Sequence, residues 1–431
     1  MKKINFITLG CSKNLVDTEH IMRQIDGQSY EVVHESDDKD ARIVVINTCG
    51  FIGDAKEESI DMILRFAEAK KEGLIDKLFV MGCLSQRYRE ELEAEIPEID
   101  ALFGARSLKE VVEGLDAEYK TELEDERKVT TPTHYAYLKI SEGCDRGCSY
   151  CAIPSIRGKH ISIPMETLVS EANKLAQKGV KELLVIAQDT TYYGIDLYGK
   201  RMIAELLGQL CKVEGIEWIR VHYTYPSQFP IELIETIKNE PKICKYIDIP
   251  LQHISDNQLR LMRRNTTKAK TVELISKLRE LIPEIAIRTT FIVGHCHESD
   301  EEYKELVDFL KWAKFERVGV FPYSEEEHTH SAEKLCDDVP QEVKNQRAEE
   351  LMALQQQISL ENNNQLIGQE LRVIIDRKED DLYVGRSQYD SPEVDQEIYI
   401  TPSRELRIGE FITVKITSTD SYELYGKQVN I

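Results

Sequence analysis

Three cysteines lie close together near the middle of the chain, in the run Cys144-Asp-Arg-Gly-Cys148-Ser-Tyr-Cys151. Closely spaced thiolates on a loop are typical ligands of an iron–sulfur cluster. A [4Fe–4S] cube has four irons, so three cysteines leave one iron open to another ligand. A zinc site with a distant fourth ligand is the alternative, although zinc ligands usually come as two separate pairs. The spacing therefore favours a cluster with an open iron.

Three further cysteines, Cys11, Cys49 and Cys83, are 38 and 34 residues apart, yet each follows a predicted buried strand by one or two residues. The carboxyl ends of parallel strands converge on one crevice, where three thiols could hold a second cluster. The alternative is three small buried side chains. Three of the remaining cysteines lie in or beside predicted elements, and we expect no ligand role for them: 211, 244 and 336.

The residues around the second set of cysteines alternate between strands and helices. Residues 1–120 contain predicted strands and helices that imply a doubly wound parallel α/β sheet: strands 3–9, 42–47, 77–81 and 101–103, helices 13–26, 52–71 and 85–94. Residues 116–134 are charged and then Thr/Pro-rich, which indicates a linker.

A second alternation extends over residues 134–365 and ends in a long polar helix at 340–366. Its six predicted strands indicate a partial (β/α)6 barrel: 136–141, 183–188, 218–222, 246–251, 286–293 and 318–323. Chemistry in such a barrel lies at the carboxyl ends of the strands, where polar candidates occur: Gln188, Asp189, His222, Gln252, His253, Arg288, Thr290 and Tyr323. Residues 367–431 alternate apolar and polar at period two, which predicts a small antiparallel β-barrel with strands at 371–375, 382–386, 398–400 and 411–417.

Composition sets limits on the partners. The 431 residues carry a net charge of −22 and are 41% hydrophobic, so the chain can bury a core, and the excess of carboxylates disfavours generic phosphate binding. The last domain holds eight Lys/Arg and thirteen Asp/Glu, a net charge of −5, which suits a basic protein better than RNA. The N-terminus has no secretory signal and no segment approaches 18 apolar residues, so we expect a cytoplasmic protein without a membrane partner.

The central cysteine motif and its position after the first barrel strand resemble the radical S-adenosylmethionine (SAM) superfamily. The resemblance implies a [4Fe–4S] cluster on Cys144, Cys148 and Cys151 whose open iron chelates SAM. Tyr150 matches the aromatic residue that the superfamily usually carries before its last cysteine. By the same resemblance we expect SAM contacts from strand ends, at Gln188, Arg288 and Gly294.

The runs TLGCSKNLVDTE, NTCGFI and MGCLSQRY resemble the N-terminal domain of the methylthiotransferases, and the similarity covers essentially the whole chain. It implies a second [4Fe–4S] cluster on Cys11, Cys49 and Cys83, and a C-terminal TRAM domain. It also implies reductive SAM cleavage, hydrogen abstraction from the substrate, sulfur delivery from the second cluster and methyl transfer from a second SAM. An electron donor and a sulfur donor are needed.

Two branches of that family differ in substrate. The MiaB-like branch modifies an adenosine of tRNA, and the RimO-like branch modifies the β-carbon of an aspartate in small-subunit ribosomal protein twelve. The motifs here are similar to the RimO-like branch, among them Asp189-Thr-Thr-Tyr-Tyr-Gly194, His222-Tyr-Thr-Tyr-Pro226 and Gly385-Arg386-Ser-Gln-Tyr-Asp-Ser-Pro392. The acidic last domain agrees with a basic protein substrate. A more remote alternative is a non-catalytic iron–sulfur or RNA-binding protein.

One turn departs from the family pattern. After the fifth barrel strand, Cys296 and His297 replace the usual Pro-Gly pair in Gly294-His295-Cys296-His297-Glu298. Proline presets φ and glycine allows positive φ, so we expect an altered or strained turn and an uncertain effect on SAM binding. A His-Cys-His metal site is the alternative, but three successive residues rarely point at one ion.

Overall fold

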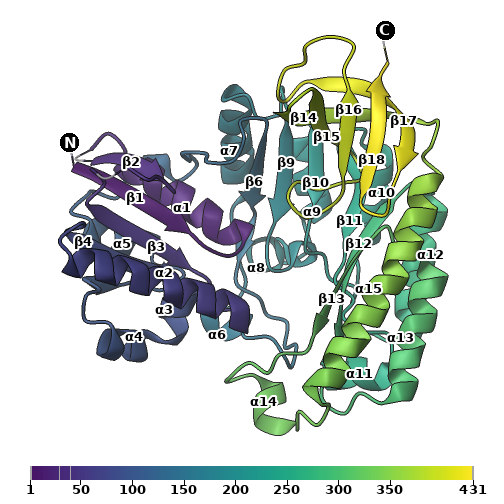
Figure 1. Cartoon of the computed structure of the whole chain (residues 1–431), viewed down its shortest axis with the longest axis horizontal. Coiled ribbons are helices and arrows are strands. Elements are labelled where there is room, and N and C mark those ends of the chain that lie inside the picture. The colour runs from purple at the N-terminus through teal and green to yellow at the C-terminus, as the bar shows by residue number, and fades with distance from the viewer. Residues whose placement is uncertain (1, 29, 39, 430–431) are drawn as a thin grey trace.

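The computed structural model describes residues 2–28, 30–38 and 40–429. Residues 1, 29 and 39 of the predicted N-terminal domain, and residues 430–431 of the last one, lie outside the described residues. Figure 1 shows the N-terminal domain on the left, the central domain in the middle and on the right, and the last domain above it.

The N-terminal domain is the predicted doubly wound parallel sheet, with strand order β2-β1-β3-β4-β5. Its strands are β1 (Lys2–Thr8), β2 (Tyr30–His34), β3 (Ile43–Thr48), β4 (Lys77–Gly82) and β5 (Ala101–Leu102). Helices α1 (Ser12–Ile25) and α5 (Leu108–Gly114) pack on one face, and α2 (Gly53–Lys71), α3 (Cys83–Arg87) and α4 (Arg89–Glu95) pack on the other. The strand order reverses between β1 and β3, which is where a crevice forms in such sheets.

The central domain contains six parallel strands in one sheet, in the order β13-β12-β11-β10-β9-β6, so the predicted (β/α)6 arrangement is confirmed. The strands are β6 (Tyr135–Lys139), β9 (Glu182–Ile186), β10 (Trp218–Val221), β11 (Ile243–Asp248), β12 (Ala286–Val293) and β13 (Arg317–Pro322). Helices cover its outer face: α7 (Met165–Gln177), α9 (Ile203–Leu210), α10 (Ile231–Asn239), α12 (Lys268–Leu281), α13 (Asp300–Ala313) and α15 (Gln341–Asn364).

Short elements complete this domain around the inner face of the sheet. They are β7 (Ser141–Glu142), α6 (Ile153–Arg157), β8 (Ile161–Ser162), η2 (Thr190–Tyr192), α8 (Ile195–Tyr198), α11 (Asp256–Leu261) and α14 (His330–Lys334). Along β12, Arg288, Thr290 and Ile292 are less buried than their odd-numbered neighbours. Because side chains alternate along a strand, these three share the face that points into the open barrel.

The predicted linker at 116–134 is ordered and anchored to both neighbouring domains. It contains the short helix η1 (Thr121–Leu123), and the fully buried guanidinium of Arg127 follows it. Arg127 lies 2.9 Å from the Glu19 carboxylate of α1 and 2.7 Å from that of Glu171 on α7. This shared cation fixes the N-terminal domain against the barrel, because a buried charge is costly to separate from its partners.

The C-terminal domain is a closed five-stranded barrel in the order β14-β15-β16-β18-β17. Its strands are β14 (Glu370–Glu379), β15 (Leu382–Ser387), β16 (Glu397–Thr401), β17 (Phe411–Thr419) and β18 (Glu423–Gln428). Four strand pairs are antiparallel as predicted, while β16 and β18 pair in parallel. The sequence did not predict β18, and this strand closes the barrel.

The last domain docks on the barrel through buried charges. The Glu182 carboxylate accepts from Arg220 (2.9 Å) and from Arg386 on β15 (2.8 Å), and Arg386 also donates to Asp376 on β14 (2.7 Å). The side chains of Glu182, Arg220 and Arg386 are at most 2% exposed, and that of Asp376 is partly buried.

The β15–β16 loop, residues 388–396, enters the open barrel from the side of the last domain. It contacts four adjacent strands or their ends. Ser391 contacts His222 at the end of β10 (3.0 Å), and Asp390 contacts Arg317 on β13 (3.1 Å). Between them, Asp395 contacts Tyr246 on β11 (2.8 Å) and Arg288 on β12 (3.4 Å). The loop therefore forms a floor one layer beneath Thr290, which lies two residues beyond Arg288 on β12.

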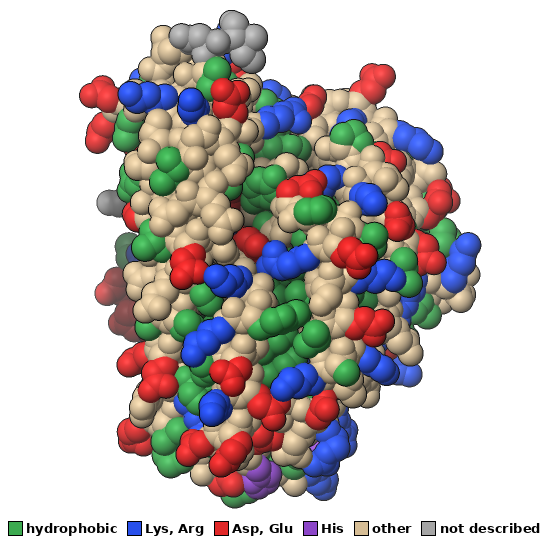
Figure 2. Space-filling view, turned by 90° about the vertical axis from the view of Figure 1, so that its right-hand side faces the viewer, with side chains coloured by type: hydrophobic (Ala, Val, Ile, Leu, Met, Phe, Trp, Pro, Cys, Tyr) green, Lys and Arg blue, Asp and Glu red, His purple; other side chains and the backbone are tan. Residues whose placement is uncertain are grey.

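Figure 2 shows the face that Figure 1 presents on its right, where acidic and basic side chains are interspersed. None of the helices in the described part of the chain combines the length and the apolar character that crossing a bilayer requires.

Candidate active site

The central cysteines lie on the loop between β7 and α6, beside the carboxyl end of β6. The loop turns through a hydrogen bond from the Cys151 N–H to the Cys148 carbonyl (3.2 Å), and the Arg146 N–H donates to the Cys144 sulfur (3.4 Å). Gly143 adopts φ +73 at the entry, where a side chain would strike the backbone of Lys159. Only glycine fits there, so this residue fixes how the loop leaves the strand.

Arg264, which sequence reasoning did not single out, is buried against this loop. Its Nη1 donates to the Cys148 sulfur and to the Tyr150 hydroxyl, each at 3.4 Å, and the guanidinium lies 4.2 Å from the Tyr225 ring centroid. Burial raises the pKa of the Cys144 and Cys151 thiols to about 12, and the Arg264 charge acts in the opposite direction at Cys151. A metal that binds Cys144 and Cys151 would therefore displace their thiol protons.

Cys11, Cys49 and Cys83 converge as predicted at the carboxyl ends of β1, β3 and β4. A Cβ at Gly10, which precedes the first of them at φ +89, would lie 2.6 Å from Cys49 Cβ. Burial, together with the neighbouring Cys11 and Cys49, raises the pKa of Cys83 to about 11. The crevice between β1 and β3 therefore holds a second group of thiols, and all ten cysteines are free.

The buried amide of Asn14 ties these three loops together. Its Nδ2 donates to the carbonyls of Leu9 (2.9 Å) and Thr48 (3.1 Å), and its Oδ1 lies 3.8 Å from the Cys83 sulfur. One side chain thus contacts the segment before Cys11, the segment before Cys49 and the third thiol itself. Asn14 is three residues from Cys11, but no local pattern in the sequence reveals this role.

The two cysteine groups face each other across the boundary between the domains. Cys83 packs with Ala152, which follows Cys151 directly, and with Ile156 four residues further on. From the same helix, α6, Arg157 donates to Asp17 (3.0 Å), to Glu142 (2.9 Å) and to the side-chain oxygen Oδ1 of Asn14. A buried cation therefore bridges the two groups, and it too was not predicted.

Both groups suit an iron–sulfur cube by the chemistry of their donors. Each offers three thiols and neither contains a disulfide. Among the described residues, no three His, Cys, Asp or Glu side chains lie close enough to hold a single metal ion. A cube is a different case, because each thiolate binds a different iron and the thiolates stay well apart.

A cavity of about 560 Å³ opens beside Tyr150, a size typical of small-molecule sites. Barrel residues Gln252, Thr290 and Tyr323 line it on one side, and residues 51–54, which follow Cys49, line it on the other. Three buried oxygens of its lining residues, Gln252 Oε1, Glu326 Oε1 and the Tyr323 hydroxyl, have no hydrogen-bond partner among the described residues. Buried polar atoms are normally satisfied, so this cavity is built for a polar ligand.

Family models match the three domains in turn. The match at residues 3–104 carries the description "Uncharacterized protein family UPF0004", residues 138–310 match the radical SAM superfamily, and residues 367–429 match the TRAM domain.

Curated relatives match over the whole length. A ribosomal protein uS12 methylthiotransferase RimO from Bacteroides thetaiotaomicron is 54% identical over 430 residues, covering 100% of this chain and 99% of the relative. One of the same name from Flavobacterium johnsoniae is 56% identical, covering 99% and 98%. The chain belongs to the RimO family of radical SAM methylthiotransferases. Membership of the radical SAM superfamily implies a [4Fe–4S] cluster and SAM.

Solved structures with the same fold are more distant from this RimO family member. The radical SAM methyltransferase TsrM from Kitasatospora setae, with cobalamin and a [4Fe–4S] cluster bound, aligns with a TM-score of 0.57 at 13% identity, covering 77% of each chain. The cobalamin-dependent radical SAM enzyme OxsB aligns with a TM-score of 0.53 at 14% identity, covering 82% of this chain and 56% of that one.

The four residues expected to contact SAM lie in different surroundings. Tyr150 lines the cavity, whereas the other three are not part of its described lining. Gln188 donates to Glu142 (3.0 Å), and Arg288 is paired with Asp248 (3.2 Å) on the barrel floor. Gly294 adopts φ +70 and donates its N–H to the buried Glu298 carboxylate, which shapes the turn after β12.

The departure from the RimO family pattern in this turn has the predicted consequence. His297 occupies the glycine position with φ +63, a strained conformation for a side chain of this kind. The three residues also point in different directions: His295 is buried against Gln258 (3.1 Å) and Ser331 (3.0 Å), Cys296 is buried, and His297 contacts Asp338 (2.7 Å) at the surface. They do not form a common metal site.

Proposed function

We propose that this chain methylthiolates the β-carbon of an aspartate in ribosomal protein uS12. The observation that carries the proposal is that residues next to both free cysteine groups line one cavity. Cys83 packs on the segment that follows Cys151, and residues 51–54 after Cys49 share the cavity with Tyr150. A target placed there lies within reach of both groups. The curated relatives named for this activity support the choice of substrate.

In this proposal Cys144, Cys148 and Cys151 hold one [4Fe–4S] cluster and Cys11, Cys49 and Cys83 hold a second. When bound, the clusters and SAM supply the radical chemistry that an unactivated C–H bond requires. Arg264 stabilises negative charge on the Cys148 sulfur, to which it donates at 3.4 Å. Asn14 holds the second group of thiols in place.

The cavity residues bind and orient SAM. Tyr150 contacts it directly, and the free oxygens of Gln252 and Glu326 accept hydrogen bonds from its ammonium or hydroxyl groups. Arg288 acts from the layer beneath by holding Asp248, and Gln188 and Gly294 act through Glu142 and Glu298. Enclosure between two domains keeps water and stray hydrogen donors away from the reacting atoms.

The proposed partners follow from the chemistry. Besides uS12, free or within the small ribosomal subunit, the enzyme needs an electron donor and a sulfur donor. We assign the reaction to the cytoplasm, where ribosomal proteins are found and thiols remain reduced. The −5 charge of the last domain favours a basic protein over tRNA.

The test uses the full chain with both clusters reconstituted, SAM, a reductant and sulfide, and either purified uS12 or a tRNA transcript. We expect a methylthio group on one aspartate of uS12 by mass spectrometry, and no change in the tRNA. Cys148→Ala should abolish 5′-deoxyadenosine formation, whereas Cys49→Ala should retain it and lose methylthiolation.

Cys336→Ala is the matched control, because this cysteine is exposed and belongs to neither group. It should behave like the wild type in both assays. Formation of 5′-deoxyadenosine by Cys148→Ala would refute the assignment of the radical cluster. Modification of the tRNA in place of uS12 would refute the proposed substrate.

A further inference from the structure

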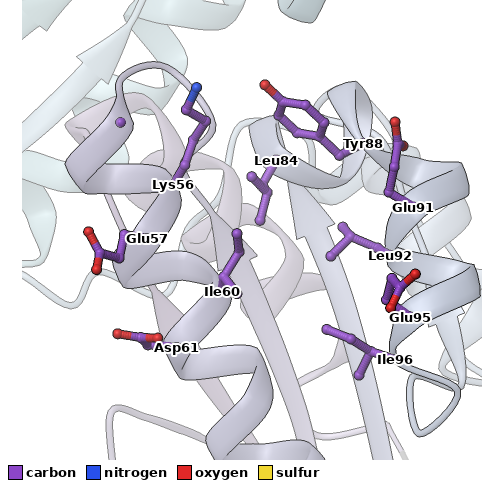
Figure 3. A pocket seen from close by; sticks show the side chains of 11 residues that line it. Lys56, Glu57, Ile60, Asp61, Leu84, Tyr88, Glu91, Leu92, Glu95 and Ile96 are labelled. Atoms are coloured by element: carbon purple, nitrogen blue, oxygen red, sulfur yellow. The ribbon is translucent and has the colours of Figure 1, made fainter.

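A second hollow lies on the outer side of the N-terminal domain, in a groove of about 500 Å³ between α2 and the α3–α4 segment. Figure 3 shows Ile60 of α2 facing Leu92 and Ile96 across the groove, with Leu84 between them. Ile60 is 39% exposed, although its three apolar neighbours are buried. The groove thus presents an apolar floor to solvent.

Both walls of this groove carry carboxylates. Glu57 and Asp61 extend from α2, and Glu91 and Glu95 extend from α4 (Figure 3). All four are exposed. The one cation in the described lining, Lys56, is already bound to the Glu326 carboxylate at 3.0 Å. The groove therefore offers an apolar floor between two unneutralised acidic walls.

One end of the groove meets the cavity beside Tyr150. Gly53 lines both. At this end Lys56 binds Glu326 and Tyr88 donates to Glu327 (3.0 Å), which joins the groove to the loop after β13. Ile52, exposed by 39%, lines the cavity mouth. A chain that inserts one residue into the cavity can therefore continue over Ile52 into the groove.

We propose that this groove binds a basic segment of the substrate protein that neighbours the target aspartate. A protein that binds ribosomal RNA is rich in Lys and Arg, which complement the acidic walls. The α2 wall from Gly53 to Asp61 is roughly 12 Å long, enough for about four extended residues. An apolar side chain of the segment packs on Leu84 and Ile60. The inference rests on the proposed function and names its recognition surface.

Two pairs of variants test it in the reconstituted full chain. Glu57→Lys with Glu91→Lys neutralises the carboxylate charge of both walls, and its control, Glu68→Lys with Glu90→Lys, makes the same charge change on the same helices outside the groove. Ile60→Gln removes the apolar contact, and its control is the exposed Leu64→Gln one turn further along α2.

We expect both groove variants to weaken uS12 binding and raise its KM by about tenfold or more. The charge variant should also show a weaker salt dependence. Formation of 5′-deoxyadenosine without uS12 should be unchanged, and both controls should match the wild type. If the groove variants bind and turn over uS12 like the wild type, the inference is wrong while the proposed function stands.

Two further results would overturn it in other ways. Failure of the wild type to methylthiolate uS12 would remove the proposed function and this inference together. A change in self-association by sedimentation, without a change in uS12 binding, would assign the groove to a second copy of the chain.

Discussion

Glu182 is the centre of the contact between the barrel and the last domain, and its replacement by glutamine gives the sharpest prediction. Each carboxylate oxygen accepts from a different guanidinium, that of Arg220 at 2.9 Å and that of Arg386 at 2.8 Å, and Glu182 is fully buried. Glu182→Gln preserves the shape but leaves two buried cations. Arg386 keeps Asp376 as a partner, whereas Arg220 loses its carboxylate.

The expected cost follows from that difference. Breaking a buried ion pair by removing one partner costs about 3–5 kcal/mol. Because Arg386 keeps Asp376, we expect a value near the lower end, about 3 kcal/mol. The matched control is Glu217→Gln, which breaks the exposed Glu217–Arg372 pair (2.7 Å) across the same two domains. Both of its side chains are 48% exposed, so it should cost no more than about 1 kcal/mol.

Trp218 provides the signal for this measurement. Its ring centroid lies 4.8 Å from that of Phe411 on β17, so its fluorescence reports whether the last domain is docked. The second of the two tryptophans, Trp312, is 51% exposed and can be replaced by phenylalanine to remove its background. Urea unfolding of both variants in this Trp312→Phe chain gives the two free-energy differences.

The pH dependence provides an independent check on the same carboxylate. Burial raises the pKa of Glu182, but Arg386 and Arg220 lower it further, and the net value is below the ordinary one. Its stabilising effect is therefore present above the unfolded pKa, about 4.3, and is lost as the pH falls through the folded value. The difference in the free energy of unfolding between Glu182→Gln and the wild type should become smaller as the pH is lowered through this range. Equal costs for Glu182→Gln and Glu217→Gln at pH 7 would refute the reasoning.

Three further predictions concern the site. Burial lowers the pKa of His295 to about 4, so the chain takes up a proton when it unfolds between pH 4 and about 6.5. The free energy of unfolding should therefore decrease as the pH is lowered from about 6.5 to 4. In urea titrations, His295→Gln should make this decrease smaller. Gly10→Ala would place a Cβ 2.6 Å from Cys49 Cβ and so displace the second group of thiols. Iron per chain should drop from about eight to about four, while SAM cleavage persists. A full iron content would contradict this prediction. His297→Gly relieves about 1 kcal/mol of backbone strain, but it loses the exposed contact with Asp338 and increases the conformational entropy of the unfolded chain. The free energy of unfolding should therefore change by less than about 1 kcal/mol. His297→Val, with a β-branched side chain at positive φ, should lower it by more than about 1 kcal/mol.

Local patterns in the sequence were enough for most of the fold. Buried strands such as β3 and β12 carry their own signal, because both contain a continuous run of apolar residues, IVVI in β3 and FIV in β12. The strand β2 has an interrupted pattern, and β18 contains Gly426 and three charged or polar residues, so neither stood out. Both were defined by pairing with strands distant in the sequence, which no local window contains.

The cysteines were predictable because their residue type and position carry the chemistry. Their supporting residues were not, since Asn14, Arg157 and Arg264 act through partners that are distant in the sequence. Arg288 illustrates the opposite case. Its place at a barrel strand suggested a ligand contact, but the β15–β16 loop brings Asp395 to within 3.4 Å of it from another domain.

That same loop sets an order of events during synthesis. Asp395, the hydrogen-bond partner of Tyr246, lies 149 residues later in the chain. At typical translation rates it is synthesised roughly 7–30 s after Tyr246. Throughout that interval the barrel lacks this floor, and the Tyr246 hydroxyl lacks its Asp395 partner. The described residues that line the cavity beside Tyr150 all precede residue 345, so they are synthesised before the loop that later forms the floor beneath them.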